Sequence, residues 1–507
     1  MLAGLVAAAA ALAVGAAVAG LVEPAAAPLT AIGSTLIDAA PTPAKEFAVR
    51  TFGTNDKPVL LTLVALVVAV LAAVIGLVAW RFRAAALTAI GFLGVIGMVA
   101  ALARPGADVF WAVPSIASAA VGVGVLLVTT MSATKEPPTT PAAGDQPVET
   151  AARRRRRTLL VGLGAGVILA ALGSAGTAAS NAVRTAGSAA RRLLTLPRPG
   201  SAAPAIPADA QVAGNTAFST PTKDFYRVDI ALVTPSYSAD SWSMQIDGMV
   251  DHPTTLSYQQ LLALPMIERD ITLTCVSNEV GGAYLSTGRW LGVPFSEILK
   301  LVGPQQGVKQ LFSYSLDSGY TCSTPYQALA KVANAMVAVG LNGEPLTDAH
   351  GFPARMLVPG LFGFVSGTKW LKRLEFTTYA QREAYWTKRK WATDAPILTQ
   401  SRIDVPTSLS TLPKGKPVLA GVAWAQERGI KKVELRVDGG DWKDCKLAAD
   451  AGIDLWRQWS YVFDGPAGDH TAEVRATDET GNTQPEHRTK VFPSGATGWH
   501  SIRFTSV

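Results

Sequence analysis

Cys275 is the residue of this sequence whose surroundings best suit chemistry. It follows a β-type run, residues 271–274, and precedes a polar loop that ends in two glycines, residues 276–282. A loop of this kind presents a side chain to a site rather than burying it in a core. A thiolate there would be a soft metal ligand. A lone cysteine is more often an inert core residue, so neighbouring motifs must decide between these interpretations.

The chain has only two further cysteines, Cys322 and Cys445, and no CxxC pattern. This spacing argues against a structural zinc or iron–sulfur site. One free cysteine plus one disulfide would suit an exported protein, and the sequence leaves that pairing open.

Short motifs follow one another in a fixed order across the second half of the chain. Their residues are 220–227, then 273–282 with 286–294, then 341–346, 350–355, 358–363 and 367–370. Together they resemble the molybdopterin-binding domain of the sulfite oxidase family. Residues 396–507 resemble the immunoglobulin-like domain that follows it in that family, through residues 396–404, 437–442, 474–478 and 498–500. The resemblance covers residues 215–507.

The resemblance implies a molybdenum–molybdopterin cofactor with Cys275 as the ligand from the protein. It further implies that several residues contact the pterin or its phosphate, namely Tyr226, Arg227, His350, Arg355, Gly367, Thr368 and Lys369. A guanidinium fork suits a phosphate. Without the resemblance, His350 would be read as a turn residue, and Arg227 and Lys369 as solvated surface charges.

The implied reaction moves an oxygen atom between the metal and a small substrate, and electrons leave one at a time to a separate carrier. Arg457 matches a pocket arginine of the family. Trp391 stands where sulfite oxidases proper have an active-site tyrosine, although Tyr385 could serve instead. Glu279 and Val280 replace an arginine pair, which weakens the attraction for a dianion. We therefore expect sulfite to be a poor substrate and a less charged sulfur or nitrogen oxide compound to be preferred.

Composition divides the chain into a membrane-like half and a soluble half. Of the 507 residues, 49% are hydrophobic and only 16% are charged. Residues 1–179 read as a transmembrane anchor of about five helices and residues 180–214 as a linker. Residues 215–395 read as an α+β molybdopterin-binding oxidoreductase domain and residues 396–507 as an immunoglobulin-like β-sandwich, because short alternating runs there are separated by turn residues. In the family the sandwich often mediates dimerisation, so a homodimer is possible.

Five apolar runs are long enough to cross a bilayer: residues 2–22, 59–80, 84–103, 110–131 and 158–176. Arginines and lysines gather in two loops, one between the second and third runs and one between the fourth and fifth. Placing both loops in the cytoplasm puts everything after the fifth run outside. All five histidines lie outside these runs. Because a membrane-embedded haem normally needs axial histidines, we expect no haem, and we expect the membrane half to serve as a lipid-embedded anchor or a docking surface.

Residues 153–157 are five consecutive arginines before the last apolar run. They resemble a twin-arginine export signal placed internally, and simple positive-inside orientation explains them equally well. The net charge of +7 owes much to this run, so it does not indicate a nucleic-acid partner.

The sequence leaves rival functions open. The same fold could work in reverse, as a sulfoxide or N-oxide reductase. A different class would be a cofactor-free binding or sensor module on a membrane anchor. The expected electron partner is a cytochrome or a membrane redox protein.

Overall fold

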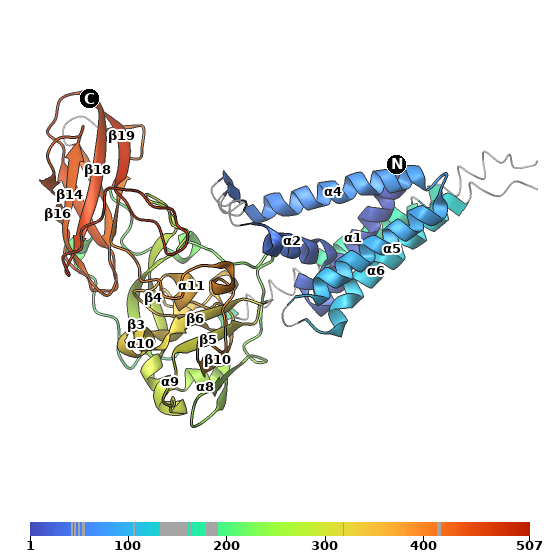
Figure 1. Cartoon of the computed structure of the whole chain (residues 1–507), viewed down its shortest axis with the longest axis horizontal. Coiled ribbons are helices and arrows are strands. Elements are labelled where there is room, and N and C mark those ends of the chain that lie inside the picture. The colour runs from blue at the N-terminus through green and yellow to red at the C-terminus, as the bar shows by residue number, and fades with distance from the viewer. Residues whose placement is uncertain are drawn as a thin grey trace, which may run out of the picture. The chain divides into compact units, whose positions relative to one another are not determined.

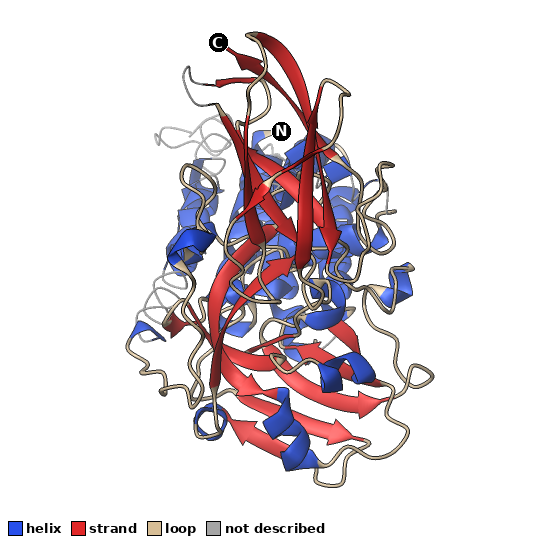
Figure 2. Ribbon diagram, turned by 90° about the vertical axis from the view of Figure 1, so that its left-hand side faces the viewer, coloured by secondary structure: helices blue, strands red, loops and turns tan. Residues whose placement is uncertain are grey.

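A computed structural model describes the chain apart from residues 42–43, 45–46, 49–50, 53–55, 105–106, 132–159, 163, 172, 179–190, 318 and 413–416 (Figure 1). Its residues form two compact units, Met1–Ser188 with Ile230–Pro235, and Ala189–Asp229 with Ser236–Val507. The first unit is helical. The second is built mainly of strands with short helices between them (Figure 2).

The helical unit contains α1 (Leu2–Val22), α2 (Pro28–Ala39), α4 (Asp56–Val78), α5 (Arg83–Leu102) and α6 (Val113–Met131). Among the described residues, five helices are long and apolar enough to cross a membrane: Leu2–Val22, Asp56–Val78, Arg83–Leu102, Val109–Thr130 and Leu160–Ala178. They confirm the five apolar helices expected from the sequence. Helix α2 was not expected, and its 12 residues are too few to span a bilayer.

Helix α1 packs closely against α4 and α6. An ideal Cβ placed on Gly4 of α1 would lie 2.8 Å from the Cα of Gly76 on α4. Only glycine allows the two backbones to approach this closely, as at many helix contacts in membranes.

The α+β region of the second unit contains two sheets. One has the strand order β2-β1-β10-β5-β6. Its strands are β1 (Ser243–Gly248), β2 (Thr254–Ser257), β5 (Gln310–Ser315), β6 (Thr321–Pro325) and β10 (Leu371–Thr377). The other has the order β3-β4-β7-β8, with β9 also paired to β7. Its strands are β3 (Ile267–Thr274), β4 (Leu285–Pro294), β7 (Met336–Leu341), β8 (Glu344–Pro345) and β9 (Arg355–Leu357).

Short helices complete the α+β region: α8 (Tyr258–Leu262), α9 (Phe295–Val302), α10 (Tyr326–Lys331) and α11 (Gly363–Ser366). A capping box between Ser257 and Gln260 starts α8. Every residue of β7 is buried, as expected for a strand covered on both faces. The core formed around these elements includes the fully buried side chains of Trp290, Phe295 and Phe376.

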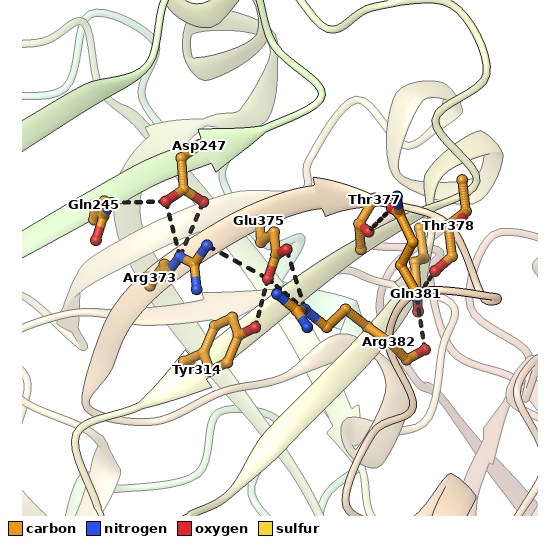
Figure 3. A network of polar contacts seen from close by, with 10 residues as sticks. Gln245, Asp247, Tyr314, Arg373, Glu375, Thr377, Thr378, Gln381 and Arg382 are labelled. Carbon is orange, nitrogen blue, oxygen red and sulfur yellow. Dashed lines mark hydrogen bonds and ion pairs between the residues drawn. The ribbon is translucent and has the colours of Figure 1, made fainter. Parts of the chain in front are cut away.

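A polar network covers one side of the first sheet (Figure 3). Arg373 pairs with Asp247 at 2.9 Å across β10 and β1. Glu375 accepts hydrogen bonds from Tyr314 at 2.5 Å and from Arg382 at 3.0 Å. These contacts join β1, β5, β10 and the segment after β10, so they support the strand that begins two residues after the site residue Lys369.

The C-terminal part is a sandwich of two sheets around one hydrophobic cluster. Their strand orders are β11-β13-β17-β16 and β12-β19-β18-β14-β15. The strands are β11 (Gln400–Val405), β12 (Ser410–Leu412), β13 (Val418–Trp424), β14 (Ile430–Val437), β15 (Lys443–Asp444), β16 (Lys446–Leu447), β17 (Arg457–Val462), β18 (Gly468–Asp478) and β19 (His500–Ser506). The turn residues after β14 have positive φ at Asp438 and Gly439, in the five-residue connection between β14 and β15. A two-layer β-structure was correctly predicted, and its immunoglobulin-like character stays a prediction.

The sandwich is attached to β3 by hydrogen bonds. The amide of Thr272 donates to the carbonyl of Asp454 at 2.9 Å. The amide of Trp456 donates to the hydroxyl of Thr272 at 2.9 Å, and the Gln426 side chain donates to the Thr272 carbonyl at 2.9 Å. Because β3 leads directly into Cys275, the sandwich helps to fix the strand that carries this cysteine.

Candidate active site

Cys275 lies where β3 ends, as the sequence indicated. Its amide donates to the carbonyl of Tyr284 at 3.0 Å, and its carbonyl accepts from the amide of Asn278 at 3.0 Å. The amide of Ser277 donates to Sγ at 3.4 Å. The loop is thus folded back on the cysteine, and its backbone offers a hydrogen bond to the sulfur.

The electrostatics around the thiol are mixed. Burial raises the pKa of Cys275, whereas the Ser277 hydrogen bonds and the positive charge of Lys369 favour the thiolate. The side chain is only 9% exposed. A thiol held in this way resists ionisation in the empty protein, and a bound metal would drive off its proton.

Lys369 follows α11 and extends into the same site. Its Nζ donates to Asp229 at 2.8 Å and to the carbonyl of Ala349 at 3.0 Å. Arg227 also contacts Asp229, at 2.9 Å. Burial lowers the pKa of Lys369 to about 8, although the carboxylate of Asp229 favours the charged form. The lysine therefore carries a positive charge at neutral pH.

His350 and Arg355 add two further groups. Burial and the positive charge of Arg355 lower the pKa of His350 to about 4, so this imidazole is neutral at pH 7. Its Nδ1 hydrogen-bonds the Thr347 hydroxyl at 2.7 Å. Among the described residues, Nε2 of His350 and Nε of Arg355 are buried without a hydrogen-bond partner. Buried polar groups are normally satisfied, so these two atoms indicate a polar ligand that the protein alone does not supply.

Aromatic rings hold these groups in place. The Arg355 guanidinium lies 5.0 Å from the ring centre of Trp290, a favourable cation–π contact. Phe225 stacks on Tyr226 and meets the ring of His350 edge-on at 5.7 Å. Burial raises the pKa of Tyr226, so the phenol stays protonated and can donate a hydrogen bond.

A glycine lets the backbone approach the cations. Gly351 has φ +104, and an ideal Cβ on it would lie 2.9 Å from the Cβ of Lys369 and 3.2 Å from that of Arg355. A side chain at this position would push the two cationic residues out of place. The glycine that follows His350 therefore has a direct steric role.

Gly367 and Thr368 lie in the segment that leads to Lys369. The Thr368 hydroxyl shares a 2.6 Å hydrogen bond with Ser313, and its carbonyl accepts from the amide of Met356 at 3.0 Å. The Gly367 amide donates to the carbonyl of Gly363 at 2.8 Å. Both residues lie next to the cluster, but these backbone and hydroxyl groups are already used to hold α11 and β9 together.

Two site residues escaped the sequence analysis. Asp229 links Arg227 to Lys369. Tyr320 is partly buried, and the neighbouring thiols of Cys322 and Cys275 add to desolvation in raising its pKa. Its hydroxyl donates to the carbonyl of Gly367 at 3.4 Å. Neither residue belongs to the motifs that carried the resemblance, so only the fold brings them to Cys275.

Two expected catalytic residues, Arg457 and Trp391, lie away from Cys275. Arg457 donates to the carbonyls of Ala448 at 3.1 Å and Ile430 at 2.9 Å, inside the sandwich. Trp391 packs against the rings of Phe364 and Phe492, and against Trp386. Within the described part of the chain, no hydrogen bond or ring contact joins Arg457 or Trp391 directly to Cys275. The Trp391 ring is linked through Trp386 and Tyr385 to the ring of Tyr320. The catalytic role of Arg457 and Trp391 stays a prediction.

The three cysteines are unpaired. Cys322 is fully buried in β6, and burial raises its pKa to about 11. Cys445 lies in the core of the sandwich. The disulfide that the sequence left open is absent from the described structure.

Comparison with known proteins identifies the domain. Residues 231–386 match the family described as oxidoreductase molybdopterin binding domain. A nitrate reductase (NADH) of Solanum lycopersicum is 29% identical over 326 residues, which cover 50% of this chain and 34% of the relative. The mitochondrial sulfite oxidase of Homo sapiens is 28% identical over 304 residues, which cover 50% of this chain and 55% of the relative.

The chain spans about a third to about half of the length of these curated relatives. The crystal structure of the sulfane dehydrogenase SoxCD from Paracoccus pantotrophus aligns with a TM-score of 0.49 at 23% identity, covering 56% of this chain and 81% of that one. The resemblance noted in the sequence is confirmed by the matched domain and the curated relatives. Residues 231–386 thus form a molybdopterin-binding oxidoreductase domain, and about half of the chain is similar to nitrate reductases and sulfite oxidases.

Proposed function

We propose that this protein holds a molybdenum–molybdopterin cofactor beside Cys275 and transfers an oxygen atom to or from a small sulfur or nitrogen oxide compound. The observation that carries the proposal is the buried cluster of Arg355, Lys369 and His350 next to this thiol. Two of its nitrogen atoms lack partners among the described residues. Burying a cation that is only partly paired is costly, and an anionic cofactor would offset the cost of burying Arg355, for which Nε has no partner among the described residues.

The donor set fits a phosphorylated pterin. Arg355 offers a planar guanidinium, which suits a phosphate better than a point charge does. Lys369 adds a second cation that Asp229 only partly neutralises, because Asp229 also pairs with Arg227. The neutral imidazole of His350 can donate or accept a hydrogen bond at Nε2, depending on its tautomer. These groups would bind and orient the cofactor.

When bound, the molybdenum cofactor supplies two-electron oxygen-atom transfer. The protein then has three tasks. Cys275 must give up its proton and bind the metal through Sγ, and Lys369 and the Ser277 amide favour this charge state. Tyr226 and Tyr320, both partly buried and protonated, can donate hydrogen bonds inside the site. The folded loop of residues 275–284 and the sandwich residues that bind β3 keep the cysteine in position.

The substrate is proposed to be an anion or a polar oxide. The relatives include both sulfite oxidases and nitrate reductases, at nearly equal identity, so the direction of transfer has two candidates. Oxidation of a sulfur compound is the first. Reduction of a nitrogen oxide or sulfoxide on the same fold is the second, and the nitrate reductase relatives favour it. Because Arg457 is engaged by two carbonyl groups, we still expect sulfite itself to be handled poorly.

The proposal also places the protein in a cell membrane. Five apolar helices support a multi-pass anchor. Placement of the catalytic domain outside the cytoplasm rests on the arginine and lysine distribution in the loops. The five arginines of residues 153–157, on which the twin-arginine hypothesis depends, lie outside the described residues. A separate electron carrier, the absence of haem and a homodimer are further parts of the same proposal.

The decisive experiment is metal and pterin analysis of the purified full-length protein. We expect one molybdenum and one pterin per chain. A substrate screen in both directions, with artificial electron donors and acceptors, then assigns the reaction. Protein that folds but contains neither molybdenum nor pterin after expression in a cofactor-producing host would refute the proposal and favour a binding or sensor module.

A further inference from the structure

A tight turn on the surface of the second unit carries three consecutive cations between two tryptophans. It runs from Trp386 through Lys388, Arg389 and Lys390 to Trp391, and we call it the basic turn. The amide of Trp391 donates to the carbonyl of Trp386 at 3.1 Å. The two indole rings meet edge to face, with their centres 5.6 Å apart. The turn is therefore closed at its base, and the cations lie together in its tip.

The two lysines of the basic turn are available to a partner. Lys388 and Lys390 are exposed, and neither forms an ion pair with another described residue. Arg389 is held against the protein instead. Its guanidinium lies 3.6 Å from the ring centre of Tyr385 and donates to the Tyr385 carbonyl at 2.9 Å. The turn thus presents two mobile positive charges on a base that is fixed by aromatic packing.

The surface around the basic turn is positive as well. The ring of Phe492 packs on Trp391 at 5.3 Å, and the exposed Lys490 lies two residues before Phe492. Glu383 and Asp394 are the exposed carboxylates nearest to the turn in sequence. Cations therefore outnumber carboxylates here, and the surface favours a partner with negative charge.

Aromatic rings connect the basic turn with the surroundings of Cys275. The ring centre of Trp386 lies 5.1 Å from that of Tyr385, which lies 6.1 Å from that of Tyr320. Such separations are those of rings in contact. Tyr320 in turn lies close enough to Cys275 for the two side chains to interact electrostatically. Because electrons tunnel more readily through atoms in contact than across gaps, this chain of rings is a path between the site and the surface.

We propose that the basic turn is the docking surface for a one-electron carrier protein with an acidic surface, coupled to the cofactor site through the rings of Trp386, Tyr385 and Tyr320. Exposed charges at an interface speed association more than they tighten binding, which suits a carrier that must bind and leave quickly. An anionic bilayer also attracts lysines. However, the rings of Trp386 and Trp391 pack on other rings of the protein, so they do not stand free to enter a bilayer.

This inference rests on the proposed function, which supplies the cofactor and the need for an electron carrier. Oxidation of a substrate by one oxygen atom from water releases two electrons and two protons. Each carrier molecule takes up one electron, so two carriers dock in turn for each substrate oxidised, and the protons go to solvent. For a reductive reaction, two reduced carriers would supply the electrons at the same surface, and two protons from solvent would leave with the oxygen atom as water.

Docking can be measured without turnover. The full-length protein in detergent is titrated by calorimetry with succinylated cytochrome c, which is acidic, and with native cytochrome c, which is basic. We expect saturable binding of the acidic form alone, and it should weaken as salt is added because the lysines are exposed. The double variant Lys388→Glu/Lys390→Glu should raise the dissociation constant about tenfold. Lys431→Glu/Lys446→Glu is the matched control, because these two lysines are exposed on β14 and β16 of the sandwich.

Electron transfer tests the chain of rings. The protein is reduced chemically, freed of excess reductant and mixed with succinylated cytochrome c while the haem absorbance is followed. Trp386→Leu should lower the rate at saturating carrier severalfold and leave the dissociation constant unchanged. Trp386→Phe keeps a ring at this position and should retain most of the rate. Circular dichroism and molybdenum content establish that both variants are folded and loaded.

Each part of the inference has its own contrary result. Equal binding of the two forms of cytochrome c, or an unchanged dissociation constant in Lys388→Glu/Lys390→Glu, would overturn the docking surface. So would binding to phosphatidylserine vesicles that this variant abolishes, if succinylated cytochrome c does not bind. An unchanged limiting rate in Trp386→Leu would overturn the path through the rings. Carrier binding by protein without molybdenum would instead contradict the proposed function and leave the docking surface standing.

Discussion

Cys275 and Cys445 are equally buried, at 9% exposed each, yet their surroundings are opposite. Cys275 lies beside Lys369 and a donating amide, which favour its thiolate. Cys445 lies in the hydrophobic core of the sandwich, where burial and the carboxylates of Asp444 and Glu434 all raise its pKa. Residue type and burial are therefore poor guides to chemistry. The sign of the neighbouring charges distinguishes the cysteine that we propose as a metal ligand from the one in the sandwich core.

The largest expected effect comes from replacing each cysteine by serine. Cys275→Ser removes the proposed metal ligand, and turnover should fall at least about a thousandfold while the protein remains folded. Cys445→Ser should retain full molybdenum content and lose only stability, because a hydroxyl is placed in an apolar core. Steady-state rates and metal analysis of both variants check this. Comparable activity in the two would remove the distinction between the two sites.

The second prediction compares two buried arginines. Arg355→Met removes a cation with an unpartnered Nε. When the supply of cofactor is limiting, the cofactor content should fall about tenfold to a hundredfold, which corresponds to the free energy of one charge-assisted hydrogen bond. The cofactor-free protein should melt at the same temperature or higher, because an uncompensated buried cation is removed. Pterin analysis and thermal unfolding of the apoprotein measure the two effects.

Arg402 provides the control for that variant. Its side chain is similarly buried but pairs with Asp404 at 2.5 Å and donates to the carbonyl of Gly282 at 2.6 Å. Arg402→Met leaves a buried carboxylate without its ion pair and should lower the melting temperature. If Arg355→Met destabilises the apoprotein as strongly as Arg402→Met does, the cation near Cys275 is structural rather than reserved for a cofactor.

A smaller effect is expected for sulfite. With Arg457 engaged by carbonyl groups and Glu279 exposed in the loop after Cys275, the site should attract a dianion weakly. We expect kcat/KM for sulfite with a one-electron acceptor to lie below about 10⁵ M⁻¹s⁻¹. A value at or above that level would show that these residues do not limit specificity and that the protein is a sulfite oxidase in the strict sense.

The smallest effect concerns a carboxyl pair at the junction of the sandwich with β3. Asp454 is 4% exposed, and its Oδ2 accepts from Asn334 at 2.6 Å. The amide of Glu427 donates to the carbonyl of Ile453 at 3.2 Å, which places the two acids side by side. Burial and the neighbouring Asp454 raise the pKa of Glu427 to about 8. Burial also raises the pKa of Asp454. The positive charge of Arg269, on β3, favours the charged carboxylate and opposes this rise only in part.

The sign of the pH effect follows from that shift. The folded protein keeps a proton on the pair that the unfolded chain releases above its ordinary carboxyl pKa. Stability should therefore fall as pH rises from about 5 to 8. Glu427→Gln keeps a hydrogen-bond donor without a titrating proton, so it should raise the melting temperature at pH 8 by a few degrees and flatten the pH profile. The effect is reduced by the solvent exposure of part of Glu427.

Melting curves from pH 5 to 9 check this, with Glu383→Gln on an exposed segment as the matched control. The control should leave the profile unchanged. An equal pH slope in wild type and Glu427→Gln would show that the pair does not share a proton. Either way, the result compares an acid pair that shares a proton with the cations Arg355 and Lys369, which are proposed to bind an anionic cofactor.

Local sequence patterns determined much of the architecture. Apolar runs of nearly constant length fixed the five helices, because a bilayer-length helix must satisfy its backbone internally. The β-type run before Cys275 became the end of β3. The Asp438–Gly439 turn formed because both positions need positive φ, which these residues tolerate. In each case the physical cause acts over neighbouring residues, so the sequence alone carries it.

The site was determined by sequence only in part. The motif order indicated the molybdopterin-binding domain that residues 231–386 match, and the structure brings Cys275, His350, Arg355 and Lys369 together. Tertiary structure alone decided that Asp229 divides its charge between Arg227 and Lys369, and that Tyr320 lies near Cys275. It also decided that the Arg457 guanidinium binds carbonyls of the sandwich. Hydrogen bonds and charge interactions depend on distances across strands far apart in the chain, and no local pattern records those distances.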